Sequence, residues 1–128
     1  MEMMTRASIL IVEDDGLIAM HLCETLEKAG YHVMNPENSG ENAISRIGKG
    51  LCPDVILMDI GLGGKLDGIQ TSREIRQIRD IPVIFLTAYS NEGRIAEAKK
   101  ISPYGYILKP CMEHDLVGAI EKALHHNL

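Results

Sequence analysis

Several features that mark other protein classes are missing from this sequence of 128 residues. No apolar run approaches the roughly 20 residues of a membrane-spanning helix, and the start lacks the apolar stretch and cleavage site of a secretory signal. The three cysteines follow no metal or redox spacing, which favours a reducing compartment. No basic stripe is present, and the net charge is −5. We therefore expect a cytoplasmic protein that binds neither membranes nor nucleic acid directly.

The length and composition favour one globular domain that spans residues 1–128. The chain is long enough for a substantial core and short for two domains. Hydrophobic residues make up 45% and charged residues 24%, which is ordinary for a folded protein. No linker or low-complexity segment divides the chain. Its clustered acidic residues suit a divalent cation.

Short apolar runs alternate with amphipathic segments along the chain. Strands are predicted at 8–12, 31–35, 55–58, 82–86 and 104–108. Helices are predicted at 16–30, 40–48, 91–100 and 112–126, and another follows Asp67 and includes Ile78. Ser39 and Asp67 are the expected N-caps of their helices. This alternation predicts a mostly parallel sheet with helices on both faces and right-handed crossovers.

Chemically active residues follow four of the five predicted strands. Glu13 and Asp14 end the first, Asp59 the third, Thr87 the fourth and Lys109 the fifth. Because ligands of such sheets bind outside the carboxyl ends of the strands, we expect these side chains to converge at one edge. A lone Asp after a strand is usually a cap or turn residue, but the combination favours a functional site.

The predicted site has the chemistry for accepting a phosphoryl group. Its carboxylates are suitable Mg²⁺ ligands, and a metal would neutralise and align an incoming phosphoryl group. Asp59 is central and can act as the nucleophile that forms an acyl phosphate. Lys109 offers a positive charge and Thr87 a hydroxyl to the phosphoryl oxygens.

The segments V-E-D-D, V-I-L-M-D, L-T-A and Y-I-L-K-P resemble the receiver domain of two-component response regulators. The resemblance covers nearly the whole chain, from Ile9 to about Leu124. It implies an α/β, flavodoxin-like (βα)5 fold with strand order 2-1-3-4-5. It also implies a signalling domain rather than an enzyme, which receives its phosphoryl group from a phosphohistidine on a sensor kinase.

The resemblance also implies a role for each site residue. Asp59 would be the phosphoacceptor, and Mg²⁺ would be bound by Glu13, Asp14, Asp59 and the carbonyl of Gly61. Thr87 and Tyr106 would form the switch, and Lys109 would bind the phosphoryl group. The resemblance also implies a cis peptide bond before Pro110. Phosphorylation would alter the surface made by the fourth helix, the fifth strand and the last helix. That surface would then bind a downstream protein, an output domain or a second copy of the chain.

Four positions depart from the family pattern or leave a feature open. Glu13 stands where the family often has Asp, so it is expected to reach the metal through water. Cys111 replaces the common Phe, which predicts looser packing under the last helix. The position of Lys65, in a glycine-rich loop, is left open. Tyr89 is expected to shield the phosphoryl group from water.

Rival interpretations lack a residue that they need. Haloacid-dehalogenase-like phosphotransferases require a second Asp where this chain has Gly61. A dinucleotide fingerprint would need glycine at Leu66, and a phosphate-binding loop would need glycine at Asp59. The remaining alternative is a receiver-like interaction scaffold that phosphorylation does not regulate. Whether the domain acts alone or within a longer protein is left open.

Overall fold

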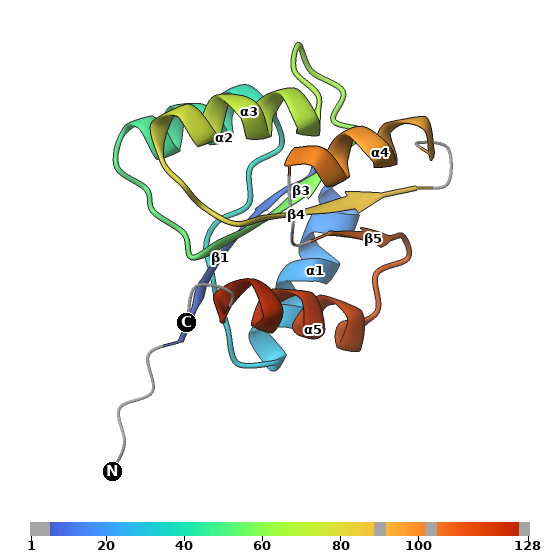
Figure 1. Cartoon of the computed structure of the whole chain (residues 1–128). Coiled ribbons are helices and arrows are strands. Elements are labelled where there is room, and N and C mark those ends of the chain that lie inside the picture. The colour runs from blue at the N-terminus through green and yellow to red at the C-terminus, as the bar shows by residue number, and fades with distance from the viewer. Residues whose placement is uncertain (1–5, 89–91, 102–104, 126–128) are drawn as a thin grey trace.

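The computed structural model describes residues 6–88, 92–101 and 105–125. Five parallel strands form one sheet in the order β2-β1-β3-β4-β5, as predicted (Figure 1). The strands are β1 (Ser8–Val12), β2 (His32–Val33), β3 (Val55–Asp59), β4 (Val83–Thr87) and β5 (Tyr106–Leu108). The helices are α1 (Gly16–Lys28), α2 (Gly40–Gly48), α3 (Gly68–Ile78), α4 (Glu92–Ile101) and α5 (Glu113–Leu124).

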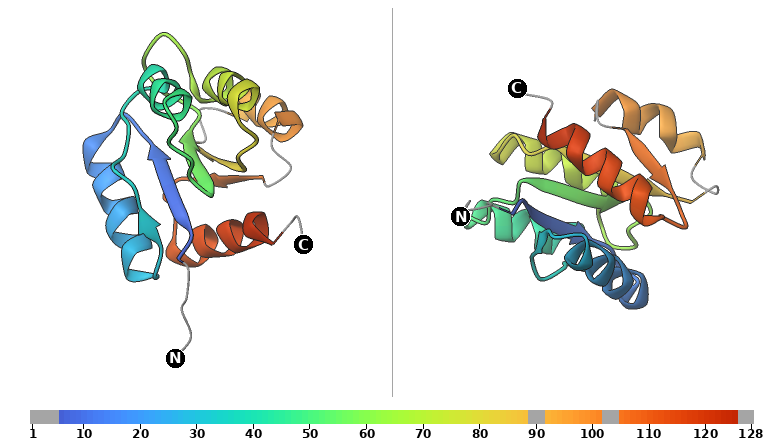
Figure 2. Two further views of the ribbon diagram at one scale, coloured as in Figure 1. Left: turned by 90° about the vertical axis from the view of Figure 1, so that its left-hand side faces the viewer. Right: turned by 90° about the horizontal axis from the view of Figure 1, so that it is seen from below.

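The helices form a layer on each face of the sheet. α1 and α5 cover one face, and α2, α3 and α4 cover the other (Figures 1 and 2). Side chains of the central strands alternate between two apolar clusters: Leu57 packs with α1 and α5, whereas its neighbours Ile56 and Met58 pack with α2, α3 and α4. This alternation explains why the central strands read as continuous apolar runs, since both faces are buried.

Polar side chains cap the start of three helices. The carboxylate of Asp15 accepts hydrogen bonds from the first turn of α1, and Ser39 and Asp67 cap α2 and α3 as predicted. Gln70 completes a capping box with Asp67. The capping role of Asp15 was not predicted from the sequence. Asp15 therefore differs from its acidic neighbours Glu13 and Asp14, which do not cap the helix.

Strand β2 is shorter than predicted. It ends at Val33 instead of Asn35, although the Met34 amide still donates to the Ile9 carbonyl at 2.9 Å. Pro36 has no amide hydrogen and interrupts the ladder at this sheet edge. Pairing resumes only as an isolated bridge between Val12 and Glu37.

Three further predictions about packing and element ends need correction. Ile78 is 44% exposed instead of buried, because α3 ends there and Arg79 is already extended. Ala96 is exposed and Ala98 is the buried small residue of α4. Strand β5 begins at Tyr106, after Gly105 with a positive φ of 93°. Asn91, Tyr104 and His126, where predicted elements begin or end, lie outside the described residues, as does Tyr89.

Strand register brings the predicted site residues to one edge. Val12 pairs with Met58, so Glu13 follows β1 beside Asp59 at the end of β3. Thr87 pairs with Leu108, which puts Lys109 one residue beyond the end of β4. The peptide bond between Lys109 and Pro110 is cis, as predicted. Glu13, Asp59, Thr87 and Lys109 therefore all lie at the carboxyl end of the sheet.

Candidate functional site at the carboxyl end of the sheet

Three carboxylates meet at the carboxyl end of β1 and β3. One ligand oxygen from each of Glu13, Asp14 and Asp59 lies within 4.8 Å of the others. Glu13 and Asp59 are buried, whereas Asp14 is exposed at the rim. The Gly61 amide donates to Asp59 Oδ1 at 3.2 Å, and the Asp15 amide donates to Glu13 Oε2 at 3.1 Å. The backbone therefore fixes the two buried carboxylates.

Lys109 lies between the two buried carboxylates. Its Nζ is 2.9 Å from Glu13 Oε1 and 3.2 Å from Asp59 Oδ1. The sequence predicted a cation at this edge but not its bond to Glu13. Among the described residues, three carboxylates therefore face one ammonium group. If all are ionised, the cluster carries a net charge of −2, which one divalent cation would balance. This donor set fits Mg²⁺, which favours carboxylate oxygens.

Burial and pairing act in opposite directions on the ionisation of this cluster. Burial raises the pKa of Glu13 above its ordinary value, while the hydrogen bond from Lys109 opposes that rise. Burial would lower the pKa of Lys109, but its bonds and the charges of Glu13 and Asp59 outweigh this, and its pKa is raised. Lys109 therefore stays a cation, and its hydrogen bond favours the ionised form of Glu13.

Thr87 is the last residue of β4, at the site, whereas Tyr106 begins the neighbouring strand β5 and pairs with Phe85. Thr87 is fully buried, and its hydroxyl donates to the carbonyl of Ala88 at 3.2 Å. Tyr106 is half-buried, and Lys99 Nζ of α4 lies 5.4 Å from its ring centroid. Among the described interactions, none joins the Thr87 hydroxyl to Asp59. The structure thus brings the hydroxyl to the site without a direct bond to that carboxylate.

The loop between β3 and α3 closes one side of the site. Leu62 is buried in the core, and the Gly63 amide donates to Asp14 Oδ2 at 3.1 Å. Gly68 packs so tightly that a Cβ there would lie 2.1 Å from the carbonyl oxygen of Asp59. Lys65 is exposed. The bond to Asp14 was not predicted and ties this rim carboxylate to the loop.

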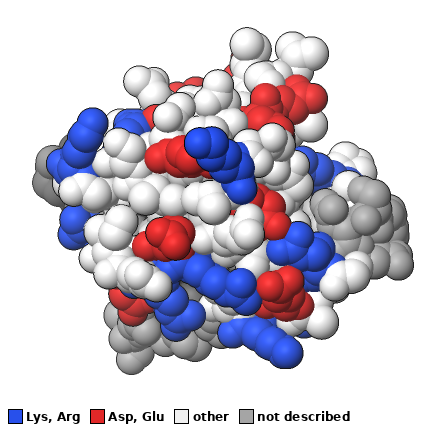
Figure 3. All heavy atoms as spheres, turned by 90° about the horizontal axis from the view of Figure 1, so that it is seen from above, with Lys and Arg blue, Asp and Glu red and all other residues white. Residues whose placement is uncertain are grey.

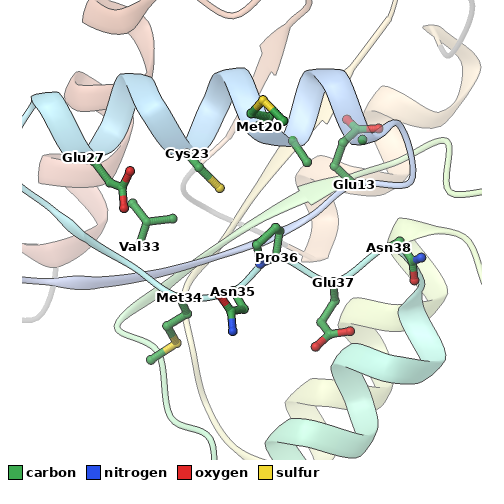
Figure 4. Close-up of a pocket in the computed structure, with 12 residues that line it drawn as sticks. Glu13, Met20, Cys23, Glu27, Val33, Met34, Asn35, Pro36, Glu37 and Asn38 are labelled. Atoms are coloured by element: carbon green, nitrogen blue, oxygen red, sulfur yellow. The ribbon is translucent and has the colours of Figure 1, made fainter.

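Two hollows adjoin the site on either side of α1. A groove of about 440 Å³ between α1 and the β2–α2 connection reaches Glu13 at one end, with Cys23 pointing into it (Figure 4). A mainly apolar depression of about 540 Å³ lies between α1 and the segment after β5. Its lining residues are Leu17, Ile18, His21, Leu22, Lys109, Pro110, Cys111 and Met112. Glu13 and Lys109 of the site therefore each border a hollow beside α1.

The family model for the response regulator receiver domain matches residues 9–121. This chain is a receiver domain of two-component response regulators. The match spans all the site residues, so the likeness covers the same carboxyl edge whose geometry is described above.

Relatives of the receiver differ in length. It is 34% identical over 116 residues to the transcriptional regulatory protein PdtaR of Mycobacterium tuberculosis, covering 91% of this chain and 56% of that protein. It is 36% identical over 122 residues to the protein PilH of Pseudomonas aeruginosa, covering 92% of this chain and 98% of that protein. The chain thus spans about half of one relative and nearly all of the other.

Solved structures support the same fold. The N-terminal domain of a response regulator/sensory box/GGDEF protein from Carboxydothermus hydrogenoformans matches with a TM-score of 0.85 and 39% identity. That match covers 94% of this chain and 95% of the other. Within the described part of the receiver, no helix is both long and apolar enough to cross a bilayer.

Proposed function

We propose that the receiver accepts a phosphoryl group on Asp59 in a Mg²⁺-dependent reaction. The observation that carries this proposal is the group of three carboxylates within 4.8 Å, two of them buried, with Lys109 bonded to both buried members. A structural ion pair would need one carboxylate for one ammonium. The excess negative charge at the end of the central strand supports a site for a divalent cation and a phosphoryl group.

The chain's own groups have separate roles in this reaction. A carboxylate oxygen of Asp59 bonds to phosphorus while the phosphorus–nitrogen bond of a phosphohistidine breaks, and the departing imidazole takes up a proton from solvent. Lys109 donates to a phosphoryl oxygen in place of one carboxylate. Glu13, Asp14, Asp59 and the Gly61 carbonyl would hold Mg²⁺. When bound, the ion supplies positive charge that offsets the phosphoryl oxygens.

The switch would begin at Thr87. Its hydroxyl now bonds only to the adjacent carbonyl of Ala88 among the described contacts, so that bond can be exchanged for one to a phosphoryl oxygen. Movement of Thr87 would free space for Tyr106, whose ring now lies half-buried under Lys99. Rotation of that ring would change the surface formed by α4, β5 and α5. A second copy, a downstream protein or an output domain would bind this surface.

The sensor kinase would dock along the start of α1. Four large apolar side chains are exposed among the described residues, and three of them, Leu17, Met20 and Met112, belong to α1 or to the segment after Lys109. Leu17 and Met112 line the same depression as Lys109. A partner that covers these side chains would bring a phosphohistidine to the edge where Asp59 lies.

The experiment is labelling with acetyl phosphate in the presence and absence of Mg²⁺, read by intact-protein mass spectrometry. We expect a Mg²⁺-dependent gain of one phosphoryl group in the wild type and none in Asp59→Asn. Asp14→Asn should label more slowly because it loses a metal carboxylate. Equal labelling of wild type and Asp59→Asn would overturn the assignment. An unlabelled wild type that still binds a partner would favour the alternative of a scaffold independent of phosphorylation.

A further inference from the structure

A carboxylate from the β1–α1 connection and one from α2 hold the loop between β3 and α3. The Gly63 amide donates to Asp14 Oδ2 at 3.1 Å, and the Leu66 amide donates to Glu41 Oε1 at 3.2 Å. Glu41 belongs to the first turn of α2, which lies beside α3 (Figure 1). The loop that carries Gly61 is therefore fixed to both α2 and the rim of the site.

The loop backbone passes close to the Glu41 side chain. A Cβ added to Gly64 would lie 3.1 Å from Glu41 Oε2 and 3.4 Å from Oε1. The residue before Glu41 is also tightly placed, because a Cβ on Gly40 would lie 1.9 Å from the Thr71 hydroxyl oxygen of α3. The start of α2 is thus pressed against α3, so Glu41 is presented to the loop from a closely packed helix.

Favourable interaction with the helix dipole would account for an acidic residue in the first turn of α2. It does not account for the direction of the Glu41 carboxylate, which accepts from Leu66 rather than from its own helix. The cap of α2 is already made by the hydroxyl of Ser39, which accepts from Asn42. On this outer face, acidic and basic side chains are interspersed, with no field of one sign (Figure 3). The local contacts therefore point to the loop as the partner of Glu41.

We infer that Glu41 is a positioning residue for the metal site. By holding the loop at Leu66, it keeps the Gly63 amide on Asp14 and the Gly61 amide on Asp59. Release of the loop would free the exposed Asp14 side chain, and binding an ion would then have to order both. This inference rests on the proposed function, because it assumes that the site binds Mg²⁺.

Mg²⁺ titration calorimetry of four proteins tests this role. We expect Glu41→Ala to weaken Mg²⁺ binding about threefold to tenfold, which is the size of the loss of one ordinary hydrogen bond. Glu41→Gln should stay within about twofold of wild type, because its amide oxygen can accept the same bond. Ser39→Ala weakens the same helix without touching the loop, so its Mg²⁺ affinity should equal that of the wild type. Amide hydrogen exchange at Leu66 should accelerate in Glu41→Ala and not in Glu41→Gln.

A second variant keeps the test valid if Glu41→Ala alone does not fold. Gly64→Ala introduces a methyl group against the Glu41 carboxylate, so it should weaken Mg²⁺ binding when made alone. In the double variant with Glu41→Ala the same substitution should have a much smaller effect. An unchanged Mg²⁺ affinity in Glu41→Ala would overturn the inference. It would also be overturned if Glu41→Gln lowered the Mg²⁺ affinity as much as Glu41→Ala, because the negative charge of Glu41 and not its hydrogen bond would then be responsible. A wild type that binds no Mg²⁺ would overturn the proposed function and this inference with it. Wild-type binding with an unaffected Glu41→Ala overturns the inference alone.

Discussion

Replacing Lys109 by Met should destabilise the metal-free receiver strongly. The substitution keeps most of the side-chain volume and removes the cation that both buried carboxylates contact. The side chains of Glu13 and Asp59 are only 1% and 6% exposed, so water cannot take the place of the ammonium group. Loss of one partner from a buried ion pair typically costs about 3–5 kcal/mol. Because the Lys109 side chain is itself 22% exposed, we expect the lower end, about 3 kcal/mol, and a melting temperature about 10 °C lower.

The pH dependence of this loss distinguishes charge from packing. Burial raises the pKa of Glu13 above its ordinary value of 4.5, and removal of the Lys109 bond should raise it further. A carboxyl group with a raised pKa favours the folded state most below pH 4.5, and this contribution is lost as pH rises through the folded-state pKa. The deficit of Lys109→Met should therefore be small near pH 4 and grow toward pH 7.

Urea unfolding followed by circular dichroism in EDTA measures the deficit. Lys65→Met, at an exposed loop position, is the matched control and should change stability by less than about 0.5 kcal/mol. Adding Mg²⁺ should restore part of the loss in Lys109→Met, and Mg²⁺ should bind this variant more tightly than the wild type. The double variant with Glu13→Gln should be more stable than Lys109→Met alone. A deficit that is independent of pH, of Mg²⁺ and of Glu13 would refute this reasoning.

Three further predictions concern packing and buried polar groups. Burial and the hydrogen bond to Glu121 raise the pKa of Tyr31. Tyr31→Phe should therefore lower the free energy of unfolding in urea by about 1–2 kcal/mol below pH 10. This difference from wild type should shrink as the pH rises above 10, because the unfolded state then ionises Tyr31 first. Burial raises the pKa of Cys111 to about 11, so its thiol should react with Ellman's reagent at pH 8 about tenfold more slowly than the thiol of exposed Cys52; equal rates would contradict this. Gly68→Ala would force a methyl group against the carbonyl at the end of β3 and should cost about 1–3 kcal/mol by the same unfolding assay, whereas wild-type stability would mean that the loop adjusts freely.

Most of the fold could be predicted from local patterns in the sequence. The continuous apolar runs of the central strands and the spacing of apolar residues in the helices depend only on the period of each element. Prediction failed where tertiary contacts decided an end. β2 stops at Val33 because Pro36 interrupts pairing at a sheet edge, and Ile78 is exposed because α3 ends there.

The sequence by itself determined which residues share the site. The carboxyl ends of parallel strands must lie at one edge, so Asp14, Asp59 and Lys109 converge whatever their exact contacts. Only the tertiary structure decided how they pair. Lys109 bonds to Glu13, which lies 96 residues away, and Glu41 accepts from an amide 25 residues away. Such bonds depend on side-chain rotamers and on the distance between packed elements, and no local sequence period encodes either.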